Sequence, residues 1–219
     1  MPEISDTMKR YKISIQGLPA SNSENAALRL YPNAEIKYCS SFIEAINAVG
    51  KKEVDLAVLP YGNPLAGSVR ERVGRDWTAG NGNILSPKKG EVFVVQKFLN
   101  DLEKYDLVQI EKYSHRIVHC LVGLETAEFE DIKEVWTHPM AFIQCAAFVD
   151  TYEFTKHLYE DTAAAAEFVA DEGNKTYAAI ADAKAAEQNG LKVFKRGIAD
   201  IEPNFTDFVV FTSKENDVV

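Results

Sequence analysis

The chain has 219 residues, a formal net charge of −9 at pH 7 and a hydrophobic content of 46%. This length fits one large domain or two domains of about 100 residues each, and the apolar content is ordinary for a globular protein. No apolar run approaches the roughly 20 residues that cross a bilayer, and the acidic charge argues against nucleic acid because phosphate contacts need a basic face.

Strands and helices alternate over the first third of the chain. Apolar runs predict strands at Tyr11–Gly17, Glu35–Cys39 and Asp55–Pro60. The helices expected after them run from about Ser23 to Tyr31 with Ser23 or Asn22 as the cap, over Phe42–Val49 with Ser41 as the cap, and from about Val69. This order predicts a parallel sheet with right-handed crossovers.

The middle of the chain has a different composition. Residues 74–90 are rich in Gly, Asn and Pro, which indicates an excursion between two lobes. Two strand-like runs follow, at Glu91–Phe98 and at about Val108–Gly123.

A second α/β set occupies the remainder. Its expected strands are Val135–Thr137, Thr155–Tyr159, Tyr177–Ile180 and Leu191–Lys195, with helices from Pro139, from Thr162 (capped by Asp161 or Thr162) and over Asp182–Asn189. A last apolar strand, Asn204–Phe211, is expected to return to the first set. The predicted fold class is therefore α/β with two lobes and a ligand cleft between them. One lobe holds residues 1–85 and about 196–219, and the other holds about 86–195.

The stretch from Val135 to Val149 is the clearest candidate for a binding unit. A short strand ends at Thr137, and Pro139 stands at the first position of a helix, where its missing N–H has no partner to lose. The start of that helix has free N–H groups and a partial positive charge. Thr137, His138 and Gln144 are its polar residues, so the unit is typical of sites for small anions in open α/β sheets.

The three cysteines lie in apolar segments, at Cys39, Cys120 and Cys145. An odd number without paired spacing favours buried, reduced thiols over a disulfide framework. The polar N-terminus carries no signal-peptide core, so the cytoplasm is the expected compartment.

Short motifs at the ends of the predicted elements resemble those of prephenate dehydratase over most of the chain. They are Gln16–Glu24, Leu59–Val69, Ile117–Leu121 (Ile-Val-His-Cys-Leu), Thr137–Cys145 (Thr-His-Pro-Met-Ala-Phe-Ile-Gln-Cys), Thr162–Ala166 and Asn204–Phe208 (Asn-Phe-Thr-Asp-Phe). Each motif is weak by itself, but their order along the chain matches that of the family.

The resemblance implies a two-lobed fold like that of type II periplasmic binding proteins. It also implies a lyase that removes water and carbon dioxide from prephenate, or from the amino acid arogenate, without a cofactor. Thr206 matches the family's catalytic threonine, which would act as the general acid. The residues that match its substrate-binding positions are Ser23, Asn63, Ser68, Thr137, Gln144 and Thr162.

The sequence departs from the family pattern at several positions. Asp207 replaces the arginine of Thr-Arg-Phe, and Gly62, Pro64 and Asn22 replace a glutamate, a serine and a tyrosine. Asp207 either faces solvent or faces the cleft, where it would recognise an amine. Since the sequence ends soon after this strand, the phenylalanine-sensing ACT domain that often follows in the family is not expected here, and neither is control by that route.

A cationic His115 or Arg116 is the expected substitute for the missing arginine. Arg70, Arg72 and Arg75 are other candidates, although such charges usually form a solvated helix face. His115 and His119 would share a face of a strand near Cys120, but no metal site is expected there, because no carboxylate or fourth ligand has matching spacing. His119 and His138 are expected to be structural.

Two other functions remain open. One is a prephenate decarboxylase-like enzyme that retains the ring hydroxyl, and the other is a non-catalytic protein that binds aromatic acids. The expected partner is a small anionic substrate, with no nucleic acid and no membrane, and a homodimer is expected from the frequency of twofold dimers.

Overall fold

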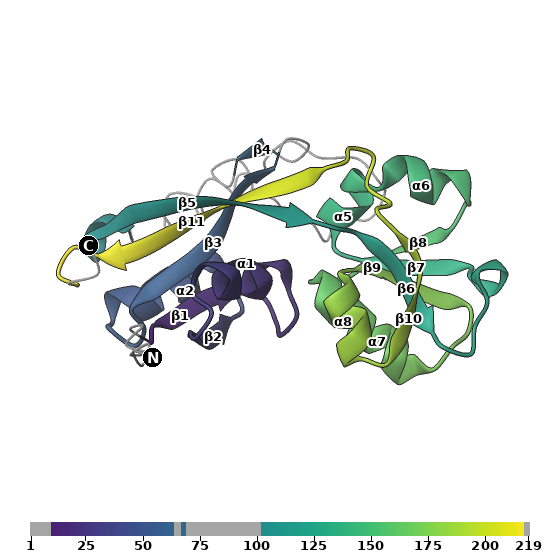
Figure 1. Cartoon of the computed structure of the whole chain (residues 1–219), viewed down its shortest axis with the longest axis horizontal. Coiled ribbons are helices and arrows are strands. Elements are labelled where there is room, and N and C mark those ends of the chain that lie inside the picture. The colour runs from purple at the N-terminus through teal and green to yellow at the C-terminus, as the bar shows by residue number, and fades with distance from the viewer. Residues whose placement is uncertain (1–9, 64–66, 69–101, 217–219) are drawn as a thin grey trace, which may run out of the picture.

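The structure is a computed structural model that describes residues 10–63, 67–68 and 102–216 (Figure 1). At 61–63 and 67–68 it describes the backbone alone. In these residues the chain forms two β-sheets, one six-stranded and one five-stranded, each accompanied by helices. The expected helix from Val69 and the expected strand Glu91–Phe98 lie outside the described residues.

The first sheet begins with the parallel arrangement that the sequence predicts. Strand β1 pairs in parallel with both β2 and β3, and helices α1 and α2 connect these strands. The bounds are β1 Lys12–Gln16, α1 Asn22–Leu30, β2 Glu35–Cys39, α2 Phe42–Gly50 and β3 Leu56–Asn63, with a short β4, Gly67–Ser68, beside β3.

The sequence predicted the N-terminal cap of α2 correctly but not that of α1. Ser41 caps α2 as expected, and its side chain accepts from the N–H of Glu44. For α1 the expected cap, Ser23 or Asn22, is wrong. Ser21 is the cap and accepts from the N–H of Glu24, because Glu24 reaches back to the N–H of Ala20 and sets the helix start one residue earlier.

Two long antiparallel strands complete the first sheet. Strand β11 (Asn204–Ser213) returns from the end of the chain and pairs with β3 on one side and with β5 (Leu107–Ile117) on the other. The sheet order is β2-β1-β3-β11-β5. In Figure 1 the β5–β11 pair extends from the first sheet toward the second. The predicted return of the last strand to the first sheet is therefore confirmed.

The apolar run at 108–123, expected as one strand, is two. It divides at Val118 and His119 into β5 and β6 (Cys120–Leu124), and β6 belongs to the second sheet. The periodicity of apolar residues predicts that a segment is a strand but not which strand it pairs with. It therefore cannot show that a run of residues passes from one sheet to another. The expected lobe boundary at 85–86 lies outside the described residues. From sheet membership we propose that the chain crosses between lobes at 118–119 and again at 197–203.

The second sheet has the order β10-β6-β9-β7-β8. Strand β7 is parallel to β8 and β9, whereas β6 is antiparallel to β9 and β10. The bounds are β7 Glu134–Thr137, β8 Thr155–Leu158, β9 Tyr177–Ala181, β10 Leu191–Arg196, α5 Pro139–Gln144, α6 Ala146–Thr151, α7 Thr162–Glu172 and α8 Ala183–Gln188.

The helix expected after Pro139 is interrupted at Cys145, which separates α5 from α6. Asp200 stabilises this interruption by hydrogen bonds to the end of α5 and to the start of α6. Its N–H donates to the backbone carbonyl of Gln144 at 2.7 Å, and its carboxylate accepts from the N–H of Ala147. This polar support from a distant loop holds Gln144 at the end of a helix.

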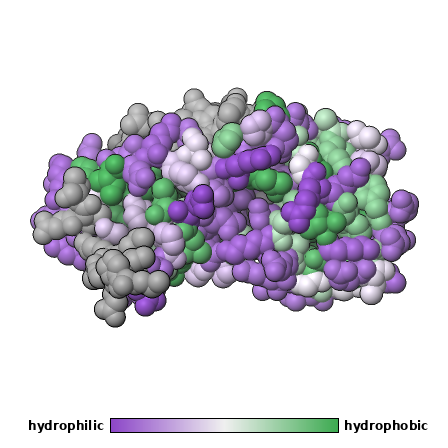
Figure 2. Space-filling model, in the orientation of Figure 1, coloured by the Kyte–Doolittle hydropathy of each residue, from purple (hydrophilic) through white to green (hydrophobic). Residues whose placement is uncertain are grey.

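Small side chains let α7 lie close to the second sheet. Ala163, Ala165 and Ala166 are buried together with Ala179 and Ala181 of β9 in one core cluster. All three cysteines are free and buried, as the sequence predicted. Among the residues that the structure describes, none of the helices has the length and apolar character needed to span a membrane. Figure 2 shows hydrophilic residues over much of the visible face, with apolar patches between them.

Gly17 follows β1 in a backbone conformation that residues with a side chain rarely adopt, with φ +123°. A Cβ there would lie 3.0 Å from Ser21 Oγ. Gly17→Ala is therefore expected to lower the free energy of unfolding by about 1–3 kcal/mol, measured by urea denaturation. The matched control is Gly190→Ala, where φ is also positive but a Cβ meets no atom within 4 Å. Equal losses in the two variants would show that crowding at Gly17 contributes nothing.

Candidate active site

A pocket of about 140 Å³ lies between the two sheets and receives residues from both. We call it the inter-sheet pocket. From the sequence-predicted site it contains Ser23, Gln144, Thr162 and Thr206. Other residues that line it include Asn22, His119, His138, Glu160, Asp161 and Phe208. Asn63 and Ser68 lie on β3 and β4, but their side chains are outside the described residues.

Strand β11 presents Thr206 and Phe208 to the pocket, and the alternation of a strand turns Asp207 to the opposite face. There the carboxylate of Asp207 lies 2.9 Å from the Lys112 ammonium and also accepts from the Ser114 hydroxyl. Hydrogen bonds from Ser114 and Lys112 hold the pKa of Asp207 below its ordinary value. Of the two expected positions for Asp207, the structure shows the one away from the pocket, so it does not recognise an amine there.

Among the described residues, neither His115 nor Arg116 lines the pocket, and the other candidates, Arg70, Arg72 and Arg75, lie outside the described residues. Arg116 is exposed and its guanidinium lies 3.4 Å from Glu202. His115 is half-buried, and burial, with a smaller contribution from Arg29, lowers its pKa, so the ring is neutral at neutral pH. Its ring packs against Phe208 at 6.2 Å between centroids, so His115 supports the pocket wall rather than supplying a charge.

Gln144 is 6% exposed and its amide is oriented by two partners. Its Oε1 lies 2.5 Å from Nε2 of His119 and 3.4 Å from Nδ2 of Asn204. Burial lowers the pKa of His119, so the neutral ring donates its Nε2–H to this oxygen. The NH₂ group of Gln144 then has no partner among the described residues and is available to a ligand acceptor in the pocket.

Thr137 has a structural contact rather than an open position. It is fully buried, and its hydroxyl donates to the backbone carbonyl of Ile180 at 2.6 Å. Because a hydroxyl has one proton and this one is donated within the second sheet, the Thr137 hydroxyl is not placed to donate to a substrate, contrary to the expectation from the sequence. Sequence patterns place Thr137 at a strand end but do not show which way its hydroxyl turns.

The start of α1 faces the inter-sheet pocket. Asn22 and Ser23 are the first two residues of this nine-residue helix, and both line the pocket. Their N–H groups have no partner within the helix, because the cap Ser21 accepts from Glu24 instead. Two free N–H groups with the partial positive charge of a helix start attract a carboxylate.

Thr162 begins α7, and the cap of that helix is Asp161, one of the two expected residues. Oδ1 of Asp161 accepts from the N–H groups of Ala163 and Ala164.

Sequence reasoning missed the placement of His119, Asn22 and Phe208 in the pocket wall. The available signal was their position within the motifs that resemble the family, which by itself does not separate core from pocket.

An ion pair joins α1 to α8 across the two sheets. The Lys184 ammonium lies 2.8 Å from Oε2 of Glu24, whose side chain is 9% exposed. Burial raises the pKa of Glu24, but hydrogen bonds from Lys184, Tyr38 and the N–H of Ala20 outweigh it and leave the pKa below its ordinary value. The pair therefore stabilises the folded chain when Glu24 is ionised.

Glu24→Gln is expected to lower the free energy of unfolding by about 1–3 kcal/mol at neutral pH. Because the folded-state pKa is lowered, this contribution is present above the ordinary value of 4.5 and disappears as the pH falls below it. The measurement is urea denaturation as a function of pH. Glu215→Gln, which breaks an exposed pair with Lys52, is the control and is expected to change little. A loss at Glu24 that is independent of pH would contradict the role of its charge.

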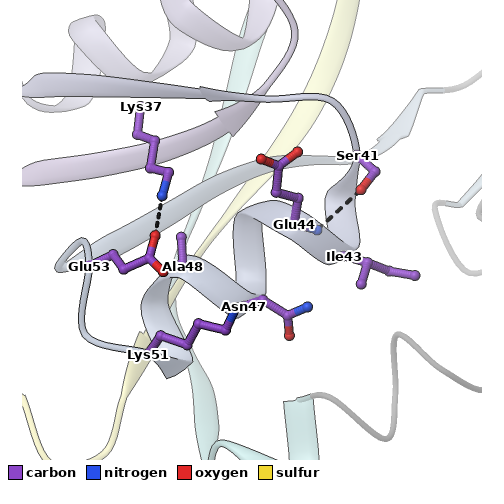
Figure 3. Close-up of a pocket in the computed structure, with 8 residues that line it drawn as sticks. All are labelled: Lys37, Ser41, Ile43, Glu44, Asn47, Ala48, Lys51 and Glu53. Atoms are coloured by element: carbon purple, nitrogen blue, oxygen red, sulfur yellow. Dashed lines mark hydrogen bonds and ion pairs between the residues drawn. The ribbon is translucent and has the colours of Figure 1, made fainter.

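A second hollow, of about 300 Å³, lies beside α2 (Figure 3). In that view Lys37 and Glu53 point toward one another at one side, and Asn47 lies between them and Ile43. It contains none of the residues that the motifs single out, so the inter-sheet pocket is the candidate site. Among the described residues no group of His, Cys, Asp and Glu is arranged to hold a metal ion.

Comparison with known proteins identifies relatives of this chain. The family model for prephenate dehydratase matches residues 13–74 and 88–216. An arogenate dehydratase/prephenate dehydratase of Arabidopsis thaliana is 31% identical over 92% of this chain and 45% of its own length. A bifunctional N-acyl-homoserine lactone acylase/prephenate dehydratase of Komagataeibacter europaeus is 30% identical over 90% of this chain and 61% of its own length.

A solved structure shares the fold. Prephenate dehydratase from Arthrobacter aurescens, in complex with L-Phe, superposes with a TM-score of 0.72 at 23% identity, over 94% of this chain and 61% of that one. The predicted two-lobed α/β fold, like that of type II periplasmic binding proteins, is thereby confirmed. The chain spans about half the length of the plant relative it matches. On the match of the family model to most of its residues, the chain belongs to the prephenate dehydratase family.

Proposed function

We propose that the chain is a lyase that converts prephenate or arogenate to phenylpyruvate or phenylalanine by loss of carbon dioxide and water. The observation that carries the proposal is the convergence of Thr206, the Gln144 amide and the start of α1 in one pocket. These groups supply one hydroxyl donor and several N–H donors, which suit a substrate with a leaving hydroxyl and carboxylates.

In this reaction the ring carboxylate departs as carbon dioxide. The electron pair of the broken carbon–carbon bond moves into the ring, and the ring hydroxyl leaves from the opposite carbon. The hydroxyl of Thr206 donates the proton that lets this group depart as water, which makes the ring aromatic. Thr206 then regains a proton from solvent. The N–H groups of Asn22 and Ser23 and the NH₂ of Gln144 hold the carboxylates, so Thr206 meets the hydroxyl in a fixed position.

The position of Asp207 removes an objection to this function. An aspartate facing a dianionic substrate would oppose its binding, but Asp207 is paired with Lys112 and Ser114 on the other face of β11. The aspartate that stands in place of the family's arginine therefore adds no negative charge to the pocket.

Product analysis tests the proposal. Purified protein is incubated with prephenate and, separately, with arogenate at neutral pH, and the products are identified by mass and absorbance. Loss of both carbon dioxide and water is expected. Loss of carbon dioxide with the hydroxyl retained would instead support the decarboxylase, which the replaced glutamate and arginine of the motifs favour. Binding of either substrate without turnover would support a non-catalytic aromatic-acid-binding protein.

We also propose that the chain works in a reducing compartment, the cytoplasm being the one expected from the sequence. Support comes from its three free, buried cysteines. A homodimer remains the expected state from the frequency of such assemblies.

A further inference from the structure

The charges of the described residues that line the inter-sheet pocket are unusual for a site that takes an anion. Its described lining includes two carboxylates, Glu160 and Asp161, and neither lysine nor arginine. His119 is a neutral donor to Gln144, and Nδ1 of His138 accepts from the N–H of Met140, so that nitrogen carries no proton. This lining suits a substrate that brings a positive charge of its own.

Asp161 has one oxygen engaged in the fold and one that is not. Oδ1 accepts from the first N–H groups of α7, whereas Oδ2 has no partner among the described residues. Oδ2 lies 3.4 Å from the position that a Cβ would take on Gly17, so it faces the β1–α1 turn across the pocket. Burial raises the pKa of this carboxyl, although the α7 N–H groups oppose the effect, and a ligand cation would reverse the shift.

Asn22 supplies a second acceptor without a donor. Its Oδ1 is buried and has no hydrogen-bond partner among the residues that the structure describes. A buried polar atom without a partner is costly, and this one belongs to a residue of the pocket lining. The NH₂ of Gln144, on a side chain more than nine-tenths buried, independently indicates a polar ligand in the same pocket.

Donors and acceptors therefore line the same pocket beside the start of α1. The N–H groups of Asn22 and Ser23 suit a carboxylate, and Oδ1 of Asn22 with Oδ2 of Asp161 suits an ammonium. An α-amino acid carries these two groups on one carbon atom, whereas a 2-keto acid offers a carbonyl oxygen in place of the ammonium. A carbonyl oxygen cannot donate to either acceptor.

Resting on the proposed function, we infer that the pocket prefers the amino acid arogenate to the keto acid prephenate, with Asp161 Oδ2 and Asn22 Oδ1 receiving the ammonium group. Wild-type kcat/KM is then higher for arogenate. Asp161→Asn keeps the cap, since asparagine caps helices as well as aspartate does, but removes the charge. It is expected to lower kcat/KM for arogenate by about 10- to 100-fold, the loss of one charged hydrogen bond. It is expected not to lower kcat/KM for prephenate, whose carboxylates Asp161 repels.

The matched control is Asp182→Asn. Asp182 caps α8 by the same contact, an oxygen that accepts from the N–H of Lys184. Asp182 is not among the residues that line the pocket, so this variant is expected to leave kcat/KM for both substrates within about threefold of wild type. A wild-type preference for prephenate, or an equal loss of both activities in Asp161→Asn, would overturn the inference.

A binding measurement separates this inference from the proposed function. Calorimetry with the two products, L-phenylalanine and phenylpyruvate, requires no turnover. Tighter binding of L-phenylalanine, lost in Asp161→Asn, supports the ammonium site even if neither substrate reacts, in which case the lyase activity alone fails. Tighter binding of phenylpyruvate, or equal weakening of both by the variant, overturns it.

Discussion

Thr206→Val is expected to lower kcat by about 100- to 10,000-fold on either substrate, the range that a general acid contributes. Valine has nearly the shape of threonine and is equally suited to a strand, so the fold and the pocket wall are retained. The change removes the hydroxyl that donates a proton to the leaving group. Steady-state kinetics of phenylpyruvate or phenylalanine formation measure the loss, and thermal unfolding checks that the variant is folded.

The neighbouring residue provides a control for this variant. Asp207→Asn alters the same strand on its opposite face, where the carboxylate pairs with Lys112. Exposed ion pairs contribute at most about 1 kcal/mol, so activity close to wild type is expected. Thr206→Val with full activity, or Asp207→Asn with the larger loss, would show that the acid lies elsewhere.

The second large effect concerns Gln144. Gln144→Leu removes the NH₂ donor from the pocket and also removes the acceptor of His119 and Asn204. We expect a fall in kcat/KM of about 10- to 100-fold from the lost contact to a carboxylate. The unpaired, buried His119 is expected to lower the free energy of unfolding by about 1–3 kcal/mol as well.

Gln144→Glu separates the two roles. A carboxylate still accepts from His119 and Asn204 but offers no donor and adds a negative charge to the pocket. It is expected to lose as much kcat/KM as the leucine variant while its unfolding midpoint stays nearer to wild type. Kinetics and urea denaturation on the same samples measure both quantities. A glutamate variant that binds substrate normally would show that Gln144 is purely structural.

Local elements were predictable from the sequence because their signals are local. Ser41 before an apolar helix, Pro139 after a strand and Asp161 before an alanine-rich run mark helix starts, and the structure confirms each. The strand Glu35–Cys39 has the bounds that its apolar run predicts. The family motifs also identified Thr206 and Gln144, which the fold brings into one pocket.

Contacts between distant parts of the chain were not predictable. The contact of Gln144 with His119 and the ion pair between Glu24 and Lys184 join residues from separate elements. Strand periodicity also shows that Asp207 and Thr206 face opposite ways, but not which of them faces the pocket. That choice depends on the register of β11 against β3 and β5, which a sequence pattern does not contain.

Protonation of the leaving hydroxyl by Thr206 is tested most directly by a crystal structure of the Thr206→Val chain with arogenate bound. The expected complex has the substrate in the inter-sheet pocket, with the ring hydroxyl beside residue 206. A carboxylate should lie within hydrogen-bonding distance of the Gln144 amide or of the N–H groups of Asn22 and Ser23. A substrate bound outside this pocket, or one whose ring hydroxyl lies far from residue 206, would contradict the assignment.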